Sequence, residues 1–301
     1  MTVPNFLIIG AVRSGTSSLY QYVRQHPEVF VSKVKEPTFF RFVDADLPSG
    51  VPGADWLQEN AVTTRREYEA LFTTAAGARA IGEGSATYLS DPEVPARIQA
   101  TIPGVRLVAI LRDPAERAYA NYRGLRRDGI DRTPTFEDAL RDEERGKRDS
   151  WPLAGLVRVG FYHKWLSGYY ALFPREQVRV YLFEDLVSNA SALMRDLFAF
   201  LDVDPRFVPD VSRRYGATGD VRNPLLRALW TRSMGVRRLL RPFLPVRWRN
   251  TAFHWVTRDV VKTPMAPATR ARLIEVFRAD IIALQDLIDR DLSAWLRLKR
   301  P

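Results

Sequence analysis

Residues 6–19 read FLIIGAVRSGTSSL, and this stretch decides the fold class. Its first four residues are continuously apolar, which is typical of a short buried strand. A turn of glycine, serine and threonine follows, and then a helical pattern that Pro27 should end. The turn has a Gly-x4-Gly frame from Gly10 to Gly15. Between a strand and a helix, this frame is that of a phosphate-binding loop.

Small residues suit such a loop because its backbone N–H groups must surround an anion at close range. The amino end of the following helix adds a partial positive charge. Hydroxyl donors come from Ser14, Thr16, Ser17 and Ser18. The lysine that binds the β- and γ-phosphates in nucleoside triphosphatases is missing, because Thr16 follows Gly15 directly. Arg13 therefore supplies the positive charge of a predicted anion site.

The rest of the chain alternates predicted strands with predicted helices. Further strands are expected at Ala80–Gly82, Val105–Leu111 and Gln177–Phe183, and Val29–Phe42 looks extended. Helical patterns cover Pro92–Thr101, Pro114–Arg127, Thr135–Arg145, Tyr162–Leu172, Ala190–Leu201 and Thr269–Trp295. This alternation predicts an α/β fold, in which helices flank a parallel sheet like that of the P-loop nucleotide hydrolases.

Composition limits the chemistry that the chain can perform. The 301 residues are 46% apolar, which is enough for the core of one domain spanning residues 1–301. Because the chain has no cysteine, disulfides, thiolate catalysis and cysteine-based zinc sites are excluded. Its three histidines are His26, His163 and His254, which are too far apart to show a metal-binding spacing. No metal is therefore expected.

The net charge of +10 comes from one segment, residues 222–258, which holds nine arginines and no acidic residue. The other 36 basic residues nearly balance the 35 acidic ones. Tryptophan, phenylalanine and leucine interleave with these arginines, so the segment is predicted to be a basic helical insertion. It could be a lid packed on the domain or a helix lying on an anionic bilayer. The chain shows no signal peptide and no apolar run of about 18 residues, which predicts a cytoplasmic protein, with peripheral membrane contact in the second case.

The loop sequence GAVRSGTSSL, residues 10–19, resembles the 5′-phosphosulfate-binding loop of the sulfotransferase superfamily. It is most similar to the branch that contains tyrosylprotein, heparan-sulfate-type and many bacterial sulfotransferases. This resemblance implies a P-loop-like α/β fold and transfer of a sulfuryl group from 3′-phosphoadenylyl sulfate (PAPS). It implies no required metal.

A second segment, RDPAERAYANY at residues 112–122, resembles the part of these enzymes that binds the 3′-phosphate. Arg112 follows a predicted strand, at the edge of a parallel sheet where ligands bind. Its guanidinium can hold a phosphate through two hydrogen bonds. The family has a serine eight residues later, where this chain has Ala120, so one hydroxyl donor is lost.

The catalytic base is predicted from KEPTFF, residues 35–40, which resembles a segment whose glutamate is the proposed base. Transfer to a hydroxyl or amine requires removal of its proton, and Glu36 would take it. Residues 82–88, GEGSATY, resemble a segment in which several members carry a catalytic lysine, but this chain has Gly84 there. Arg13 is therefore the main candidate to stabilise the departing phosphate.

Two more residues are predicted to contact the nucleotide through the same resemblance. Tyr162 opens a helix that resembles the family's Gly-x-Tyr helix, and it could line the cofactor pocket or belong to the core. Arg222 ends a stretch that resembles the flexible loop over the nucleotide, and it is the predicted phosphate contact there.

The function predicted from these motifs is sulfuryl transfer to a small-molecule, saccharide or lipid acceptor, whose identity the sequence does not reveal. One alternative is a P-loop kinase-like phosphotransferase with Asp113 as a magnesium ligand, but Asp113 also suits the cap of the next helix, and the P-loop lysine is missing. A second alternative is a non-enzymatic protein that binds membranes through residues 222–258. No nucleic-acid-recognition module is visible.

Overall fold

The structure is a computed structural model that describes residues 3–153, 155–216, 220–221, 260–261 and 264–298. The predicted basic insertion at 222–258, with Arg222, lies outside the described residues. Its assignment as a lid or membrane contact within one domain therefore stays a prediction. Every helix within the described residues is too short or too polar to cross a bilayer.

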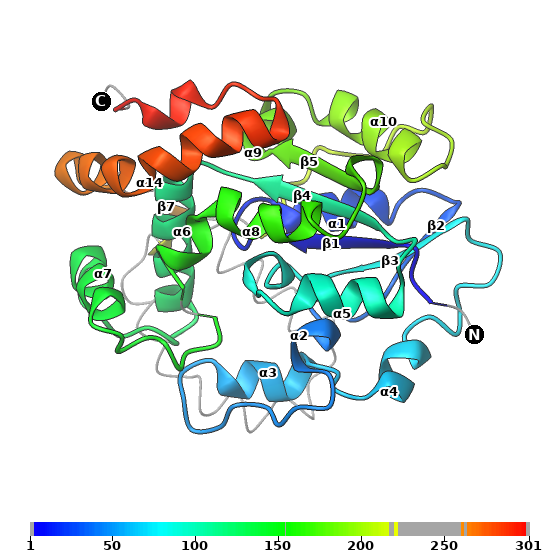
Figure 1. Ribbon diagram of the computed structural model, residues 1–301, viewed down its shortest axis with the longest axis horizontal. Helices are drawn as coiled ribbons and strands as arrows, with labels where there is room; N and C mark the ends of the chain where they lie inside the picture. The colour runs from blue at the N-terminus through cyan, green and yellow to red at the C-terminus, as the bar shows by residue number, and fades with distance from the viewer. Residues whose placement is uncertain (1–2, 154, 217–219, 222–259, 262–263, 299–301) are drawn as a thin grey trace.

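A five-stranded parallel sheet forms the centre of the fold, with the order β2-β3-β1-β4-β5 (Figure 1). The strands are β1 (Phe6–Gly10), β2 (Val29–Val31), β3 (Ala80–Gly84), β4 (Arg106–Leu111) and β5 (Val178–Leu182). All five residues of β1 are buried, which agrees with the continuous apolar run in the sequence. The predicted α/β fold with a parallel sheet is confirmed.

Helices cover both faces of this sheet. The α-helices within the described residues are α1 (Thr16–Val23), α2 (Phe39–Phe42), α3 (Ala54–Asn60), α4 (Arg65–Ala70), α5 (Val94–Thr101), α6 (Pro114–Arg127), α7 (Phe136–Glu144), α8 (Tyr162–Tyr170), α9 (Phe183–Ser188), α10 (Ala190–Phe200) and α14 (Pro267–Ile288). Side chains alternate between the faces of a strand. Phe6 and Ile8 accordingly pack with α1 and α10, whereas Leu7 and Ile9 belong to the core that includes α5, α6, α8 and α14.

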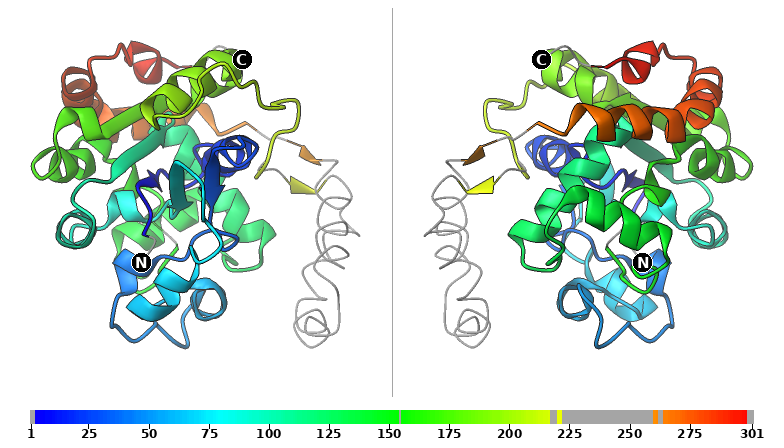
Figure 2. Two further views of the ribbon diagram at one scale, coloured as in Figure 1. Left: turned by 90° about the vertical axis from the view of Figure 1, so that its right-hand side faces the viewer. Right: turned by 90° about the vertical axis from the view of Figure 1, so that its left-hand side faces the viewer.

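Two predicted elements differ from the structure. The extended stretch expected at Val29–Phe42 ends at Val31, and residues 39–42 form the helical turn α2. This turn buries Phe39, which stacks on Tyr68 with ring centroids 4.2 Å apart, so tertiary packing outweighs the strand preference of the aromatic residues. The stretch ending at Arg222, which resembles a flexible loop, contains the strand β6 (Asp220–Val221), which pairs with β7 (Val260–Val261) outside the main sheet (Figure 2).

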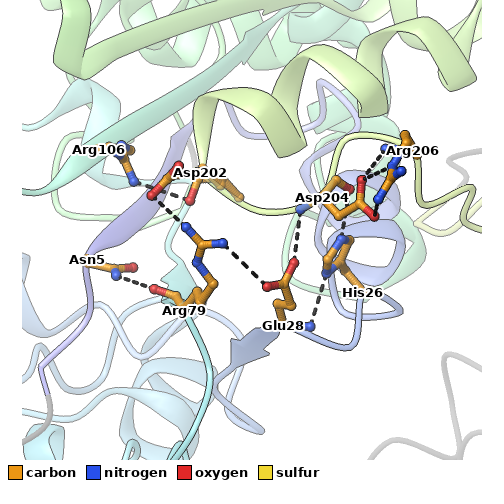
Figure 3. Close-up of polar contacts among 9 residues, drawn as sticks. Asn5, His26, Glu28, Arg79, Arg106, Asp202, Asp204 and Arg206 are labelled. Atoms are coloured by element: carbon orange, nitrogen blue, oxygen red, sulfur yellow. Dashed lines mark hydrogen bonds and ion pairs between the residues drawn. The ribbon is translucent and has the colours of Figure 1, made fainter.

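A polar network fastens the chain after α10 to the amino end of the sheet (Figure 3). Arg79, directly before β3, pairs with Glu28 at 3.7 Å and with Asp202 at 3.1 Å. The backbone N–H of Asp204 donates to the Glu28 carboxylate at 3.0 Å, and the Asp204 carbonyl lies 3.0 Å from Nε2 of His26. The segment that follows Asp204 thus starts from a fixed point.

Candidate active site

The candidate site lies where the order of the strands reverses. The chain runs from β1 towards the β2 edge of the sheet, whereas it runs from β4 towards β5. In open α/β sheets, ligands bind beyond the carboxyl ends of the strands at such a point. The Gly10–Gly15 loop follows β1 and Arg112 follows β4, so the fold brings the two predicted anion-binding segments together. They line a cleft of about 2670 Å³.

The loop after β1 requires glycine at position 15 for two reasons. Gly15 has a φ of 98°, in the left-handed region that favours glycine. A Cβ there would also lie 3.0 Å from Leu186 and 3.1 Å from Phe183. Gly15 precedes α1 and has no side chain with which to cap it. The first N–H groups of a helix have no partner within the helix, so those of α1 can bind an anion.

The four predicted hydroxyl donors of this loop occupy different positions. Thr16, Ser17 and Ser18 line the cleft, whereas Ser14 is fully buried and lies behind it. The hydroxyl of Ser18 accepts a hydrogen bond from the Tyr215 N–H at 2.9 Å and donates to the Tyr215 carbonyl at 3.2 Å. The segment that resembles the nucleotide-covering loop therefore lies against α1, on the cleft wall.

Arg13 extends from the loop to the helix α6. Its guanidinium lies against Gly124 and pairs with Asp128 at 3.6 Å. Burial lowers the pKa of Arg13, and the carboxylates of Asp128 and Glu36 act in the opposite direction. An arginine stays charged under all ordinary conditions. Arg13 therefore places a fixed positive charge on the cleft wall, within electrostatic reach of Glu36.

Arg112 connects the two anion-binding segments directly. Its Nη1 donates to the carbonyl oxygen of Arg13 at 3.3 Å, and its guanidinium lies over the ring of Phe183, 4.8 Å from the centroid. Glu116 pairs with Arg112 at 3.8 Å and with Arg270 at 3.4 Å. These contacts hold the guanidinium on the cleft wall, next to the Gly10–Gly15 loop.

The residue after Arg112, Asp113, caps α6. Helix cap and magnesium ligand are the two roles that the sequence allows for it. Its carboxylate accepts from the N–H groups of Ala115 and Glu116 at 3.0 and 3.2 Å. It also pairs with Arg270 at 2.7 Å. A carboxylate engaged in this way supports the helix.

Tyr162 is fully buried and supports Arg112 from behind the cleft. Its hydroxyl donates to the carbonyl oxygen of Arg112 at 2.9 Å, and burial raises the pKa of Tyr162 to about 12. Ala120 lines the cleft where the family has a serine. The neighbouring Asn121 does not replace that serine, because its amide donates to the carbonyl oxygens of Leu153 and Gly155.

Glu36 lies on the cleft wall and is held at three points. Its backbone N–H donates to the Gly84 carbonyl at 2.9 Å, and one carboxylate oxygen accepts from the Ala86 N–H at 2.7 Å. The other carboxylate oxygen pairs with Nζ of Lys35 at 2.5 Å. Glu36 has a φ of 63°, an uncommon conformation for a residue with a side chain. The three contacts fix the carboxylate where it can accept a proton.

Glu83 supports the segment that carries Glu36. It is completely buried and accepts hydrogen bonds from Ser85 at 2.9 Å and Tyr68 at 3.4 Å. Burial raises the pKa of Glu83 from 4.5 to about 8. The Ser85 hydroxyl in turn accepts from the N–H of Thr38 at 3.0 Å. Glu83 thus acts on the segment around Glu36 through Ser85.

Two further residues of the cleft, Asp128 and Phe183, carry no signal that singles them out in the sequence. Each reaches the site only through a contact between distant segments, such as the ion pair between Asp128 and Arg13. Lys35 stands next to the predicted base, so its adjacency to Glu36 was a usable signal.

A sequence profile described as the sulfotransferase family matches residues 4–207, which contain both anion-binding segments and Glu36. The chain belongs to the sulfotransferase family. The resemblance stated from the motifs is therefore confirmed. Nothing in the comparisons supports the kinase-like or the non-enzymatic alternative.

Among solved structures, this chain is similar to a sulfotransferase from Alicyclobacillus acidocaldarius, which agrees with the family assignment. It is 31% identical, with a TM-score of 0.78 over 99% of this chain and 100% of that one. The sulfotransferase domain of the Synechococcus PCC 7002 olefin synthase shares the fold, with 17% identity and a TM-score of 0.52 over 96% of each chain.

Curated members of the family are also similar in sequence. The bifunctional heparan sulfate N-deacetylase/N-sulfotransferase of Drosophila melanogaster is 27% identical over 209 residues, which are 68% of this chain and 20% of that protein. Human carbohydrate sulfotransferase 15 is 28% identical over 249 residues, which cover 67% and 44% of the two chains. The chain thus spans less than half the length of either relative.

Proposed function

We propose that this protein transfers a sulfuryl group from PAPS to a hydroxyl or amine acceptor. The observation that carries the proposal is the hydrogen bond from Arg112 to the carbonyl of Arg13, which joins two anion-binding segments in one cleft. PAPS carries anionic groups at both ends of its nucleoside, at the 3′- and 5′-positions. A single phosphate would not require two such segments.

The donor would be held by residues from both segments. The 5′-phosphosulfate would be bound by the N–H groups at the start of α1, by the hydroxyls of Thr16 and Ser17, and by Arg13. Arg112 would bind the 3′-phosphate. Five further predicted contacts to the donor stay predictions, those of Ser14, Gly15, Ser18, Tyr162 and Arg222. Ser18 is hydrogen-bonded to Tyr215, and Tyr162 lies behind Arg112. Arg222 lies outside the described residues.

The transfer itself would be a direct displacement at sulfur. The acceptor oxygen or nitrogen forms the new bond to sulfur, and its proton passes to Glu36. The bond between sulfur and the 5′-phosphate oxygen breaks, and 3′-phosphoadenosine 5′-phosphate (PAP) leaves. Arg13 and the loop N–H groups stabilise the charge that develops on the departing phosphate.

The acceptor is proposed to be a small molecule, a saccharide or a lipid. The two curated relatives described above are named for heparan sulfate and carbohydrate, which supports a saccharide. Trp56, Trp151 and Trp165 line the cleft, and their indole rings offer flat apolar surfaces for such a ligand. The cytoplasmic location stays a prediction.

Calorimetric titration with PAP tests the proposal, using the wild type and Arg112→Ala. Loss of a charged hydrogen-bond donor costs about 1.5–3 kcal/mol, so we expect about 10- to 150-fold weaker binding by the variant. If the wild type binds magnesium–ATP and not PAP, the kinase-like alternative replaces the proposal. If both proteins bind PAP equally, Arg112 is not the 3′-phosphate ligand.

A further inference from the structure

The cleft carries a cation, Lys35, whose role the proposed function leaves open. Position 84 provides no cation, because it is a glycine, and a Cβ there would already be in tight contact with the Tyr20 ring, 3.0 Å from its Cδ2. The Tyr20 ring is held in this place by a hydrogen bond from its hydroxyl to the Ser32 carbonyl. Charge that develops near β3 during transfer must therefore be met by another residue.

Lys35 reaches the cleft from the segment that lies beside residue 84. Because the N–H of Glu36 donates to the carbonyl of Gly84, the backbone at residues 35 and 36 lies directly beside residue 84. The Lys35 side chain is 26% exposed and lines the cleft, with its ammonium 2.5 Å from the carboxylate of Glu36. Its charge therefore lies where the proposed base must meet the acceptor.

Other cations on the cleft wall pair with carboxylates that have no part in the proposed chemistry. Arg13 pairs with Asp128 at 3.6 Å, and Arg41 pairs with Asp91 at 3.3 Å. Lys35 differs because it pairs with the proposed base itself. An ammonium that stays on Glu36 would occupy the oxygen that has to accept the proton.

We propose that Lys35 is a catalytic residue whose ammonium moves from Glu36 to the sulfuryl oxygens when PAPS binds. This inference rests on the proposed function. The lysine side chain is flexible and has three donors, so it can exchange one anionic partner for another. Glu36 keeps its position because the N–H of Ala86 still binds its second oxygen.

After this exchange, Glu36 and Lys35 both take part in the sulfuryl-transfer step. The freed oxygen of Glu36 accepts the acceptor proton as the acceptor atom bonds to sulfur. The bond from sulfur to the 5′-phosphate oxygen breaks, its electron pair leaves with PAP, and Lys35 stabilises the negative charge on the transferring sulfuryl group and the bridging oxygen.

Lys35→Met tests the proposal, with Lys33→Met as its matched control. Lys33 belongs to the same loop but is exposed, and it is not among the described residues that line the cleft. Release of PAP from PAPS would be measured with water and with a panel of phenol, saccharide and amine acceptors. We expect kcat to fall about 100- to 1000-fold in Lys35→Met, the usual loss for one transition-state donor. The affinity for PAP, which has no sulfuryl group, should change less than about twofold.

A second measurement separates direct contact with the sulfuryl group from an effect through Glu36. The Glu36→Gln variant should not turn over, so PAPS itself can be titrated. We expect PAPS to bind about 10- to 150-fold more weakly when Lys35→Met is added, with PAP binding unchanged, which corresponds to the net energy of one charged hydrogen bond, about 1.5–3 kcal/mol. Equal PAPS affinity in the two proteins would overturn the proposal, because Lys35 would then act only through Glu36.

The remaining outcomes are also distinct. Turnover of Lys35→Met at the rate of Lys33→Met would overturn the catalytic role of Lys35 and leave the proposed function intact. Parallel loss of PAP affinity and turnover would make Lys35 a structural residue and also overturn the inference. Failure of the wild type to bind PAP or to consume PAPS would instead refute the proposed function.

Discussion

The buried carboxyl of Glu83 should make the stability of this protein depend on pH. Its pKa is about 8 in the folded protein, against 4.5 for the free group, because burial disfavours the charged form. At a pH between these two pKa values, Glu83 is protonated in the folded chain and ionised in the unfolded chain. The free energy of unfolding therefore falls as the pH rises from about 4.5 to about 8.

The size of this effect follows from the difference of about 3.5 pH units between the two pKa values. Each unit corresponds to about 1.4 kcal/mol, so the contribution lost by pH 8 is at most about 5 kcal/mol. Glu83→Gln removes the titration and keeps the shape of the protonated carboxyl. The stability of the variant relative to wild type should therefore increase with pH, by up to about 1.4 kcal/mol per unit.

Urea unfolding at pH 5, 6, 7 and 8 measures this difference, with exposed Glu176→Gln as the control for loss of a carboxylate. Glu83→Gln should come close to wild type at pH 5 and exceed it clearly at pH 8, while the control follows wild type. Parallel stability curves for wild type and Glu83→Gln would refute the reasoning. They would show that Glu83 is ionised in the folded protein, despite its burial.

Three more substitutions test the site. Glu36→Gln should abolish turnover, by at least about 100-fold, and leave PAP binding intact in calorimetry; normal turnover would exclude Glu36 as the base. Gly124→Ala should raise stability by up to about 1 kcal/mol through helix propensity, yet slow turnover, because the new Cβ would lie 2.3 Å from Nη2 of Arg13. Thermal unfolding and steady-state kinetics measure these two effects, and unchanged kinetics would show that Arg13 can move without loss. Ser18→Ala should weaken PAP binding about 3- to 10-fold by releasing Tyr215, and equal affinity would show that this contact does not shape the site.

The parts of the fold that the sequence predicts depend on local signals. The apolar run of β1 and the Gly-x4-Gly frame after it specify a strand, a turn and a helix between Phe6 and Val23. Asp113 followed by Pro114 specifies the start of α6, and the structure shows the expected cap. Both segments follow strands, so the rules for parallel sheets suffice to place them at one edge.

The backbone around Glu36 could not be predicted in this way. Glu36 and Thr38 have φ values of 63° and 52°, and α2 follows them directly. These conformations are held by contacts with Gly84, Ser85 and Ala86, about 50 residues further along the chain. A single sequence does not show which distant backbone a loop will meet, so a strand was the natural expectation for these aromatic residues.

The distribution of positive charge in the cleft shows the same limit most clearly. From the motif at residues 82–88, the absence of a lysine at Gly84 is visible in the sequence, and it suggests that Arg13 is the main carrier of the catalytic charge. The structure shows that the Tyr20 ring lies against Gly84 and that the backbone of Glu36 lies beside it, which brings the Lys35 ammonium to the cleft wall. Arg13 and Lys35 are both paired with carboxylates, but only Lys35 is paired with the proposed base. A motif reports which residue is missing at one position, but only the packing of neighbouring segments shows which side chain can take over its charge.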